Sequence, residues 1–249
     1  MSLGGPAVRA WSAPGGAPPP ASTPLSLVQV IQDARTAAGG QVLFPEPAAI
    51  GHFVVLIVAS LGHVTGAHLA TPTGAALTEV ASTTLGPTTG IATGLSMWLS
   101  PALTAASGGV DFTLSGTTSD WTATMLEIQS PGPLTVDQVS TNHAATATSF
   151  TANAVTTTHA TELLIGAVGT FQFPVTSTTP VSVIVIATRY GPTATRRVLP
   201  GSFLMRVAVA VSNKVPIGPY PFNGTFATST GGLTPLATTY GALLVSLYG

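Results

Sequence analysis

The 249-residue sequence contains no cysteine, a single lysine and very little charge of either sign. Without cysteine the chain has no disulfide and no thiolate metal site, so redox chemistry does not indicate its compartment. Asp, Glu, Lys and Arg make up 6% of the residues, against roughly a quarter in ordinary globular proteins. Thr, Ser, Ala, Gly and Pro must supply most of the surface, which then carries little charge repulsion. We therefore expect a subunit of an assembly, including a homo-oligomer, rather than a freely diffusing enzyme.

Long apolar runs and a strong net charge are also missing. The formal net charge is −1, so nothing global points to a nucleic acid or an anionic membrane as partner. The longest apolar run, FVVLIVA at 53–59, is far shorter than the roughly 20 residues of a membrane-spanning helix and predicts a buried strand. The first 24 residues hold six prolines and no continuous apolar block, which is not the pattern of a signal peptide. We expect no nucleic-acid binding and no membrane insertion.

Signatures of catalysis and cofactor binding are absent from the sequence as well. The segment GLSMW at 94–98 lacks the second glycine of a G-x-S-x-G nucleophile motif. Neither a phosphate-binding loop nor a G-x-G-x-x-G motif occurs. The histidines are too few and too scattered to predict a metal site, and they are His52, His63, His68, His143 and His159. We expect a protein that is not an enzyme and that has no catalytic, cofactor-binding or metal-binding residues.

The one plausible group of carboxylates is Asp111, Asp120 and Glu127. Glycoside hydrolysis needs two carboxyl groups about 5–9.5 Å apart across one cleft. Seven residues separate Asp120 from Glu127, which on one strand corresponds to roughly 23 Å, and the odd spacing points the side chains to opposite faces. Asp120 is better explained as a residue that caps the turn before a strand. The sequence thus disfavours a glycosidase.

Residues 1–24 predict an extended N-terminal arm, because proline favours the polyproline II conformation and glycine adds freedom. The alternative is a disordered linker. Trp11 is the large aromatic of this segment and our candidate for contact with a partner chain. We expect the arm to dock on another protein, while residues 25–249 form the folded domain.

From residue 25 the sequence is rich in Val, Ile, Thr and aromatics between Gly, Pro, Ser and Asn clusters, which predicts an all-β fold. Residues 23–40 also carry helix signals, namely Thr23-Pro24 at the start and Gly39-Gly40 at the end, but alternation favours a strand. The predicted strands are 25–31, 41–44, 53–60, 77–82, 91–99, 110–115, 121–128, 136–139, 149–154, 162–169, 181–187, 204–211 and 243–247.

Two pairs of segments resemble each other and indicate an internal repeat. HFVVLIVASLG at 52–62 resembles TELLIGAVGTF at 161–171. Residues 112–130 resemble residues 226–249, because both consist of a Thr/Ser/Gly-rich turn region followed by an amphipathic strand. The domain is therefore expected to contain two similar halves, at about 51–130 and 161–249. Such a set of antiparallel strands closes most easily into two face-packed sheets, an antiparallel β-sandwich of jelly-roll type. Phe112 and Leu114 should face inward, and Thr113 and Ser115 outward.

The strand that begins at Trp121 allows two assignments of its buried face. Either Trp121, Ala123 and Met125 point inward, or Leu126 and Ile128 do. A sugar-binding platform at Trp98 or Trp121 is the functional alternative to a core position, and the core position is the better prediction for both side chains.

Charge is unevenly distributed along the chain. Two arginines against eight acids give residues 1–162 a net charge of −6, whereas five bases give residues 163–249 a net charge of +5. If these regions form different surfaces, copies could join head to tail or dock on an acidic lattice. The alternative is a set of solvated surface charges. The interaction candidates are Arg189, Arg196, Arg197, Arg206 and, as an acid that could face a neighbour's arginines, Asp120.

The succession FVVLIVASLG, LTEVASTT, DWTATMLEIQ and ELLIGAVGTF resembles a group of tailed-bacteriophage virion proteins. The resemblance covers residues 51–249 and implies a jelly-roll-like sandwich in a minor tail, fibre or particle-surface protein. It also implies assembly in the host cytoplasm and other virion structural proteins as partners, and it brings no functional residues. A capsid (head) decoration protein is one alternative. Another is an adhesin that binds a host-surface glycan through loops carrying aromatics such as Trp98, Tyr190, Tyr220 and Phe222.

Overall fold

The described part of the chain is built from antiparallel β-strands. The computed structural model describes residues 25–36, 39–70, 74–84, 93–115, 120–171, 175–180, 189–190, 205–226 and 238–249. Within these ranges there is no helix, and hence none long and apolar enough to cross a membrane. The all-β prediction is confirmed, and the segment with competing helix signals forms a strand at Ser26–Thr36. The predicted arm at 1–24 and the predicted strand at 181–187 lie outside the described residues.

The strands fall into two consecutive sets of eight. The first set, which we call the N-terminal unit, contains β1 Ser26–Thr36, β2 Gly39–Ala48, β3 Phe53–Leu61, β4 Val64–Leu69, β5 Thr78–Thr84, β6 Thr93–Leu99, β7 Ser107–Leu114 and β8 Asp120–Gln129. The second set, the C-terminal unit, contains β9 Thr135–Ala147, β10 Ser149–Thr157, β11 Glu162–Phe171, β12 Val175–Pro180, β13 Arg189–Tyr190, β14 Met205–Val215, β15 Gly218–Phe226 and β16 Thr238–Tyr248.

The two units have the same strand order. In the N-terminal unit a five-stranded sheet runs β1-β8-β3-β6-β5 and a three-stranded sheet runs β2-β7-β4. Adding eight to each number gives β9-β16-β11-β14-β13 and β10-β15-β12, which are the two sheets of the C-terminal unit. Every paired strand is antiparallel to its neighbour. The internal repeat therefore extends over 26–129 and 135–248, ranges that begin earlier than the halves proposed from the sequence.

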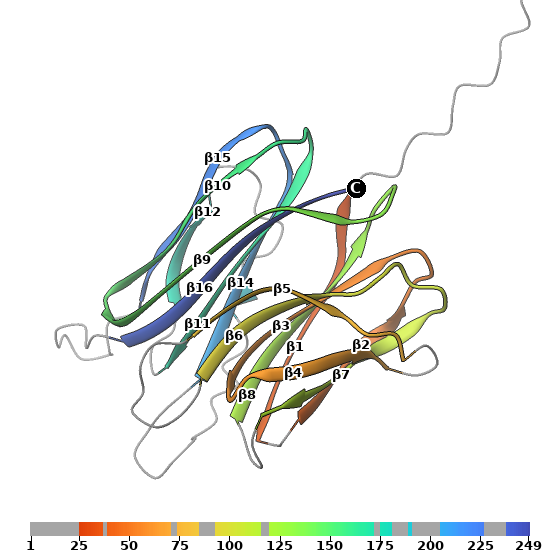
Figure 1. The fold of residues 1–249 in the computed structure, drawn as a ribbon, viewed down its shortest axis with the longest axis horizontal. Coiled ribbons are helices and arrows are strands. Elements are labelled where there is room, and N and C mark those ends of the chain that lie inside the picture. Colours follow the sequence, from red (N-terminus) through yellow and green to blue (C-terminus); the bar gives the residue numbers. More distant parts are fainter. Residues whose placement is uncertain are drawn as a thin grey trace, which may run out of the picture.

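The four sheets are stacked on one another (Figure 1), and three apolar clusters of side chains lie between them. In each unit the three-stranded sheet packs on the outer face of its five-stranded sheet, through one cluster that includes Trp121 and another that includes Phe222. The two five-stranded sheets face each other through a third cluster that includes Ile57, Leu126 and Ile165. The prediction of one sandwich with two sheets is thus wrong in the number of sheets, because each five-stranded sheet is covered on both faces.

This burial on both faces explains the composition of the central strands. All residues of β3 from Phe53 to Ser60 are buried, which accounts for the longest apolar run of the chain. On β8, Trp121, Ala123 and Met125 face the three-stranded sheet, whereas Leu126 and Ile128 face the C-terminal unit. Each of the two predicted assignments is therefore correct for the residues that it names as buried, because β8 is buried on both faces. The predicted alternation at 112–115 is confirmed, with Phe112 and Leu114 buried and the two residues between and after them exposed.

Both pairs of similar segments occupy equivalent places in the repeat. Residues 52–62 and 161–171 contain β3 and β11, and the other pair contains β8 and β16. Phe53 and Leu163 both face the central apolar layer and pair with Ile128 and Leu247. The equivalent residues of β3 and β11 therefore differ by 110 in number, and the sequence match was one residue out of register. A one-residue shift matters because it exchanges the two faces of a strand.

Gly166 of β11 lies directly under an aromatic ring. A Cβ atom added at this position would lie 2.6 Å from the Cδ2 and Cε2 atoms of Phe222, and Phe222 is itself packed against Phe150 with ring centroids 5.1 Å apart. We expect Gly166→Ala to lower the free energy of unfolding by about 1–3 kcal/mol, because an overpacked core must shift its side chains or backbone. Urea denaturation followed by fluorescence measures the change.

Gly108→Ala is the matched control for this substitution. Gly108 lies in β7, and a Cβ added there would meet no atom within 4 Å. Alanine restricts the unfolded chain more than glycine does, so we expect this variant to be unchanged or slightly more stable. Equal destabilisation by the two substitutions would contradict the packing of Phe222 on β11.

Candidate functional site

Three of the six residues proposed from the sequence for interactions fall within the described residues. Arg189 lies in β13 and Arg206 lies in β14, two neighbouring strands of the C-terminal five-stranded sheet. Asp120 is the first residue of β8 and pairs with Thr36, and the turn that it was predicted to cap lies outside the described residues. Trp11, Arg196 and Arg197 lie outside the described residues. The proposed roles of these six residues remain predictions.

The carboxylates of Asp111 and Glu127 lie in different surroundings. Asp111 is on β7, is exposed, and accepts a hydrogen bond from Gln41 Nε2 at 2.8 Å. Glu127 is on β8 and is 2% exposed. The two side chains therefore do not share the cleft that a pair of glycosidase carboxyls requires.

The aromatic side chains suggested for glycan binding are largely in the core. Trp98 is 8% exposed and its Nε1 donates to Ser96 Oγ, while Trp121 is 1% exposed and its Nε1 donates to the carbonyl of Gly39. Tyr220 and Phe222 are 6% and 2% exposed. The core prediction for both tryptophans is confirmed. Tyr220 and Phe222 were wrongly placed in binding loops, because β15 turns these aromatics inward against β10 and β11.

Glu127 is the centre of the first of two buried polar clusters. Its Oε1 lies 2.6 Å from Nδ1 of His52 and accepts the backbone N–H of Ala49 at 2.8 Å, and its Oε2 accepts Nε2 of Gln29 at 2.6 Å. We call these residues the Glu127 cluster. Both carboxylate oxygens are hydrogen-bonded, as a buried charge requires. The cluster joins β1, β8 and the loop between β2 and β3.

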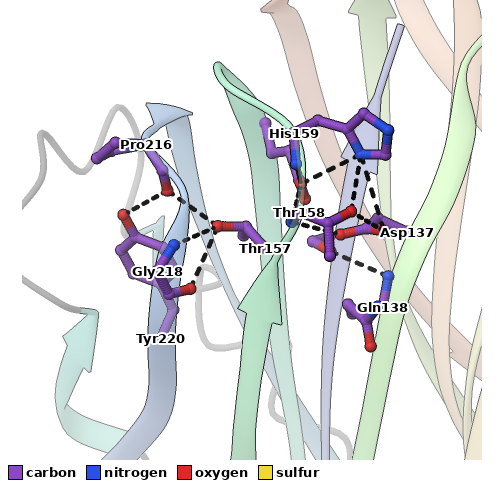
Figure 2. Close-up of polar contacts among 10 residues, drawn as sticks. Asp137, Gln138, Thr157, Thr158, His159, Pro216, Gly218 and Tyr220 are labelled. Carbon is purple, nitrogen blue, oxygen red and sulfur yellow. Dashed lines mark hydrogen bonds and ion pairs between the residues drawn. The ribbon is translucent and has the colours of Figure 1, made fainter.

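Glu162, which is fully buried, is the centre of the second cluster. Its Oε1 accepts the backbone N–H groups of Thr158 and His159 at 2.8 and 2.7 Å. Asp137 of β9 accepts the hydroxyl of Thr158 at 2.8 Å on Oδ1 and the N–H of Thr158 at 3.0 Å on Oδ2. Thr158 and His159 lie beside Asp137, as Figure 2 shows. We call Asp137, Thr158, His159 and Glu162 the Glu162 cluster.

The imidazole of His159 lies between the two carboxylates of this cluster. Its Nδ1 is 3.8 Å from Asp137 Oδ1 and 3.7 Å from Glu162 Oε1. The ring stacks on Tyr248, with centroids 3.7 Å apart and planes 13° from parallel. Burial acts to raise the pKa of Asp137, but the hydrogen bonds from the hydroxyl and the backbone N–H of Thr158 outweigh it, so the pKa lies below its ordinary value. Asp137 is therefore held as a carboxylate.

The two clusters occupy the same place in their units. Ala49 and His159 differ by 110 in number, which is the spacing of the repeat in β3 and β11, and each donates its N–H to the buried glutamate. The glutamates themselves come from different strands, Glu127 from β8 and Glu162 from β11. In both units a buried carboxylate thus fixes the loop that precedes the third strand.

The loop has the same unusual backbone in both units. Gly51 has a φ of 83° and Thr161, 110 residues later, has a φ of 70°. A β-branched residue is rare in the left-handed region and is strained there. The hydrogen bonds from Thr158 and His159 to Glu162 hold this turn in the C-terminal unit.

A second set of contacts anchors the end of β10, next to the β10–β11 loop, to the turn between β14 and β15 (Figure 2). The buried hydroxyl of Thr157 lies 2.9 Å from the carbonyl oxygen of Pro216 and accepts the N–H of Gly218 at 3.0 Å. Tyr220 donates its hydroxyl to the same carbonyl at 2.8 Å. Burial, and to a smaller extent the charge of Glu162, raises the pKa of Tyr220 above its ordinary value of 10.0.

Tyr220 should make the stability of the protein sensitive to alkaline pH. Because its pKa is raised in the folded state, its contribution is complete below the unfolded pKa near 10 and is lost as pH rises through the higher folded pKa. We expect one of the tyrosines to ionise late in an ultraviolet titration. Tyr220→Phe should lower the free energy of unfolding by about 1 kcal/mol at neutral pH, the contribution of one hydrogen bond. The same substitution should make the free energy of unfolding fall less steeply above pH 10. Normal titration of every tyrosine would contradict this assignment.

Sequence reasoning did not identify either cluster. His52 and His159 were considered among the histidines and Glu127 among the carboxylates, whereas Glu162 entered only the charge count, because no motif links these residues. The available signal was the repeat, since aligning the two units in the correct register places the two loops together. Asp137 comes from β9, which lies in the same sheet as β11 through the pairing of both strands with β16.

In comparisons with known proteins, no family model, curated protein or solved structure matches the chain. A functional interpretation therefore depends on the geometry of the described residues and on the composition of the chain.

Proposed function

We propose that this chain is a non-enzymatic structural protein of a bacteriophage particle, a surface subunit associated with the tail or its fibres. Its partners are other virion proteins and further copies of itself. The N-terminal arm docks the folded units on the particle. The particle surface is its location, after assembly in the host cytoplasm.

The observation that carries this proposal is the low charge of the exposed faces. The outward positions of β9 and β10 are occupied by neutral residues such as Thr141, Thr151 and Thr156, and two of the eight acids of the chain, Glu127 in β8 and Glu162 in β11, are buried. Neutral hydrogen-bonding surfaces resist association less than charged surfaces do. This property suits a subunit that is surrounded by neighbours.

The strand order supports a jelly roll in each unit as part of this proposal. Strands 1, 8, 3 and 6 in one sheet and 2, 7 and 4 in the other are the arrangement of two Greek keys. The segment before β5 pairs with β4, through a bridge between His68 and Ala76, before β5 itself pairs with β6. The fifth strand therefore crosses from one sheet to the other. Jelly rolls are frequent in viral capsid and lectin domains.

The buried clusters support the non-enzymatic part of the proposal. Glu127 and Glu162 both accept loop N–H groups, and Glu127 uses both oxygens in hydrogen bonds. Most of the aromatic side chains suggested for glycan binding are buried in the core, which disfavours the glycan-binding alternative. We therefore retain the structural function over the adhesin.

Incorporation into particles tests this function. A chain that lacks residues 1–24 should fold, with unchanged circular dichroism and unfolding midpoint, but should be missing from purified particles by mass spectrometry. The full-length chain supplied from the same expression system is the control. Normal incorporation of the shortened chain would contradict docking through the arm, and absence of the full-length chain would contradict a virion function.

A further inference from the structure

The two clusters differ in one respect that the loop-fixing function does not explain. In the Glu127 cluster both carboxylate oxygens have hydrogen-bond partners. In the Glu162 cluster Oε1 accepts two N–H groups, while Oε2 is buried and has no hydrogen-bond partner. A buried carboxylate oxygen without a partner is costly. The C-terminal unit also has a second acid, Asp137, where β1 has the exposed Val28 at the equivalent bulge in its pairing.

We propose that Asp137, His159 and Glu162 bind a divalent transition-metal ion such as Zn²⁺. This departs from the expectation, drawn from the sequence, that the chain has no metal-binding residues. The ion would be structural, because it would join β9, the β10–β11 loop and the start of β11. The inference is independent of the phage function proposed above.

The geometry of the three side chains fits such an ion. One ligand atom from each residue lies within 4.8 Å of the other two, and the two distances from His159 Nδ1 are 3.7 and 3.8 Å. Ligands that lie about 2.0–2.1 Å from a tetrahedral zinc ion are separated by about 3.4 Å. Small movements of the side chains would therefore complete the site.

The donor set favours a transition metal over calcium or magnesium. Two carboxylates balance the charge of a divalent ion, and an imidazole nitrogen is a ligand that zinc accepts readily. Ca²⁺ and Mg²⁺ prefer six or more oxygen ligands, and the cluster offers a nitrogen among its three residues. The fourth position would be filled by water.

The residues around the ligands would hold them in place. Thr158 donates its hydroxyl and N–H to Asp137, and Tyr248 stacks on the ring of His159. Partners of this kind orient metal ligands and are needed for tight binding. The His159 side chain is 44% exposed while Glu162 is 0% exposed, so the ion could enter from the His159 side and meet Glu162 at the bottom of the site.

The test uses the purified full-length chain, stripped with a chelator and titrated with Zn²⁺. We expect binding at a 1:1 ratio in calorimetry and, at about 100 times the dissociation constant, a rise in Tm of roughly 5–10 °C. Co²⁺ should give visible absorption bands from the bound ion. Ca²⁺ and Mg²⁺ at the same concentration should not raise Tm, and an equal rise with Ca²⁺ would overturn the transition-metal assignment.

Three variants and one matched control locate the site. Glu162→Gln keeps an oxygen for the loop N–H groups, Asp137→Asn keeps an acceptor for Thr158, and His159→Phe keeps a ring to stack on Tyr248. Each should reduce Zn²⁺ affinity at least tenfold and abolish the Tm shift. Glu127→Gln removes the corresponding buried carboxylate of the N-terminal unit and should bind Zn²⁺ as the wild type does. No binding by the wild type, or equal loss in Glu127→Gln, would overturn the proposal.

Discussion

Replacing Trp121 with alanine is expected to lower the free energy of unfolding by about 3–5 kcal/mol, the range for removing a large aromatic from a core. Trp121 is 1% exposed and meets Phe112 edge-on, with ring centroids 4.9 Å apart and planes at 76°. Its Nε1 also donates to the carbonyl of Gly39 at 3.2 Å. The side chain thus links β8 to both β7 and β2. Equilibrium unfolding in urea measures the loss.

Trp121→Phe serves as the control for this prediction. A phenylalanine keeps an aromatic ring against Phe112 but loses the indole N–H and part of the volume, so we expect a smaller loss than for alanine. If the alanine variant lost less than about 1 kcal/mol, the site would behave as a surface position, and the N-terminal sandwich would not have the core described.

Placing a charge in the central layer should have a still larger effect. Leu126 of β8 is fully buried, pairs with Val55 and Val30, and faces the C-terminal five-stranded sheet. In Leu126→Asp a carboxylate would lie in an apolar layer with no described basic partner, which costs well over 4 kcal/mol. We expect this variant to be insoluble or unfolded by circular dichroism, in both units.

Leu43→Asp is the matched substitution on the outside of the molecule. Leu43 lies on β2 and is 51% exposed, so the same change should alter stability by less than about 1 kcal/mol. If the Leu126→Asp variant folded and were as stable as the Leu43→Asp variant, this result would contradict the face-to-face packing of the two units.

The strands with strong alternation or long apolar runs could be predicted from the sequence. Strands β3, β8 and β11 were placed to within two residues of their ends because they are rich in β-branched and large apolar residues. Strand β15 was missed, since its sequence GPYPFNGTF is typical of a turn. Pro219 lies where β15 pairs with β10 alone and Pro221 lies at a bulge, so neither position requires the missing N–H.

The layered arrangement could not be predicted in the same way. A strand with two apolar faces, such as β8, was interpreted as having one buried face, because periodicity does not reveal what covers the other. The clusters were missed for a related reason. Asp137 and Glu162 are 25 positions apart in the sequence, and only the pairing of β9 with β16 and of β16 with β11 brings their strands into one sheet.

The most direct test of the account is to locate the chain on the particle. Purified particles of the phage that encodes it would be labelled with gold-conjugated antibody against residues 25–249 and imaged by electron microscopy. If the chain is a structural tail protein, we expect several gold particles on the tail of each intact phage particle. Label on the head would instead indicate a decoration protein. Particles that carry no label and contain no peptide of this chain would contradict the proposed function.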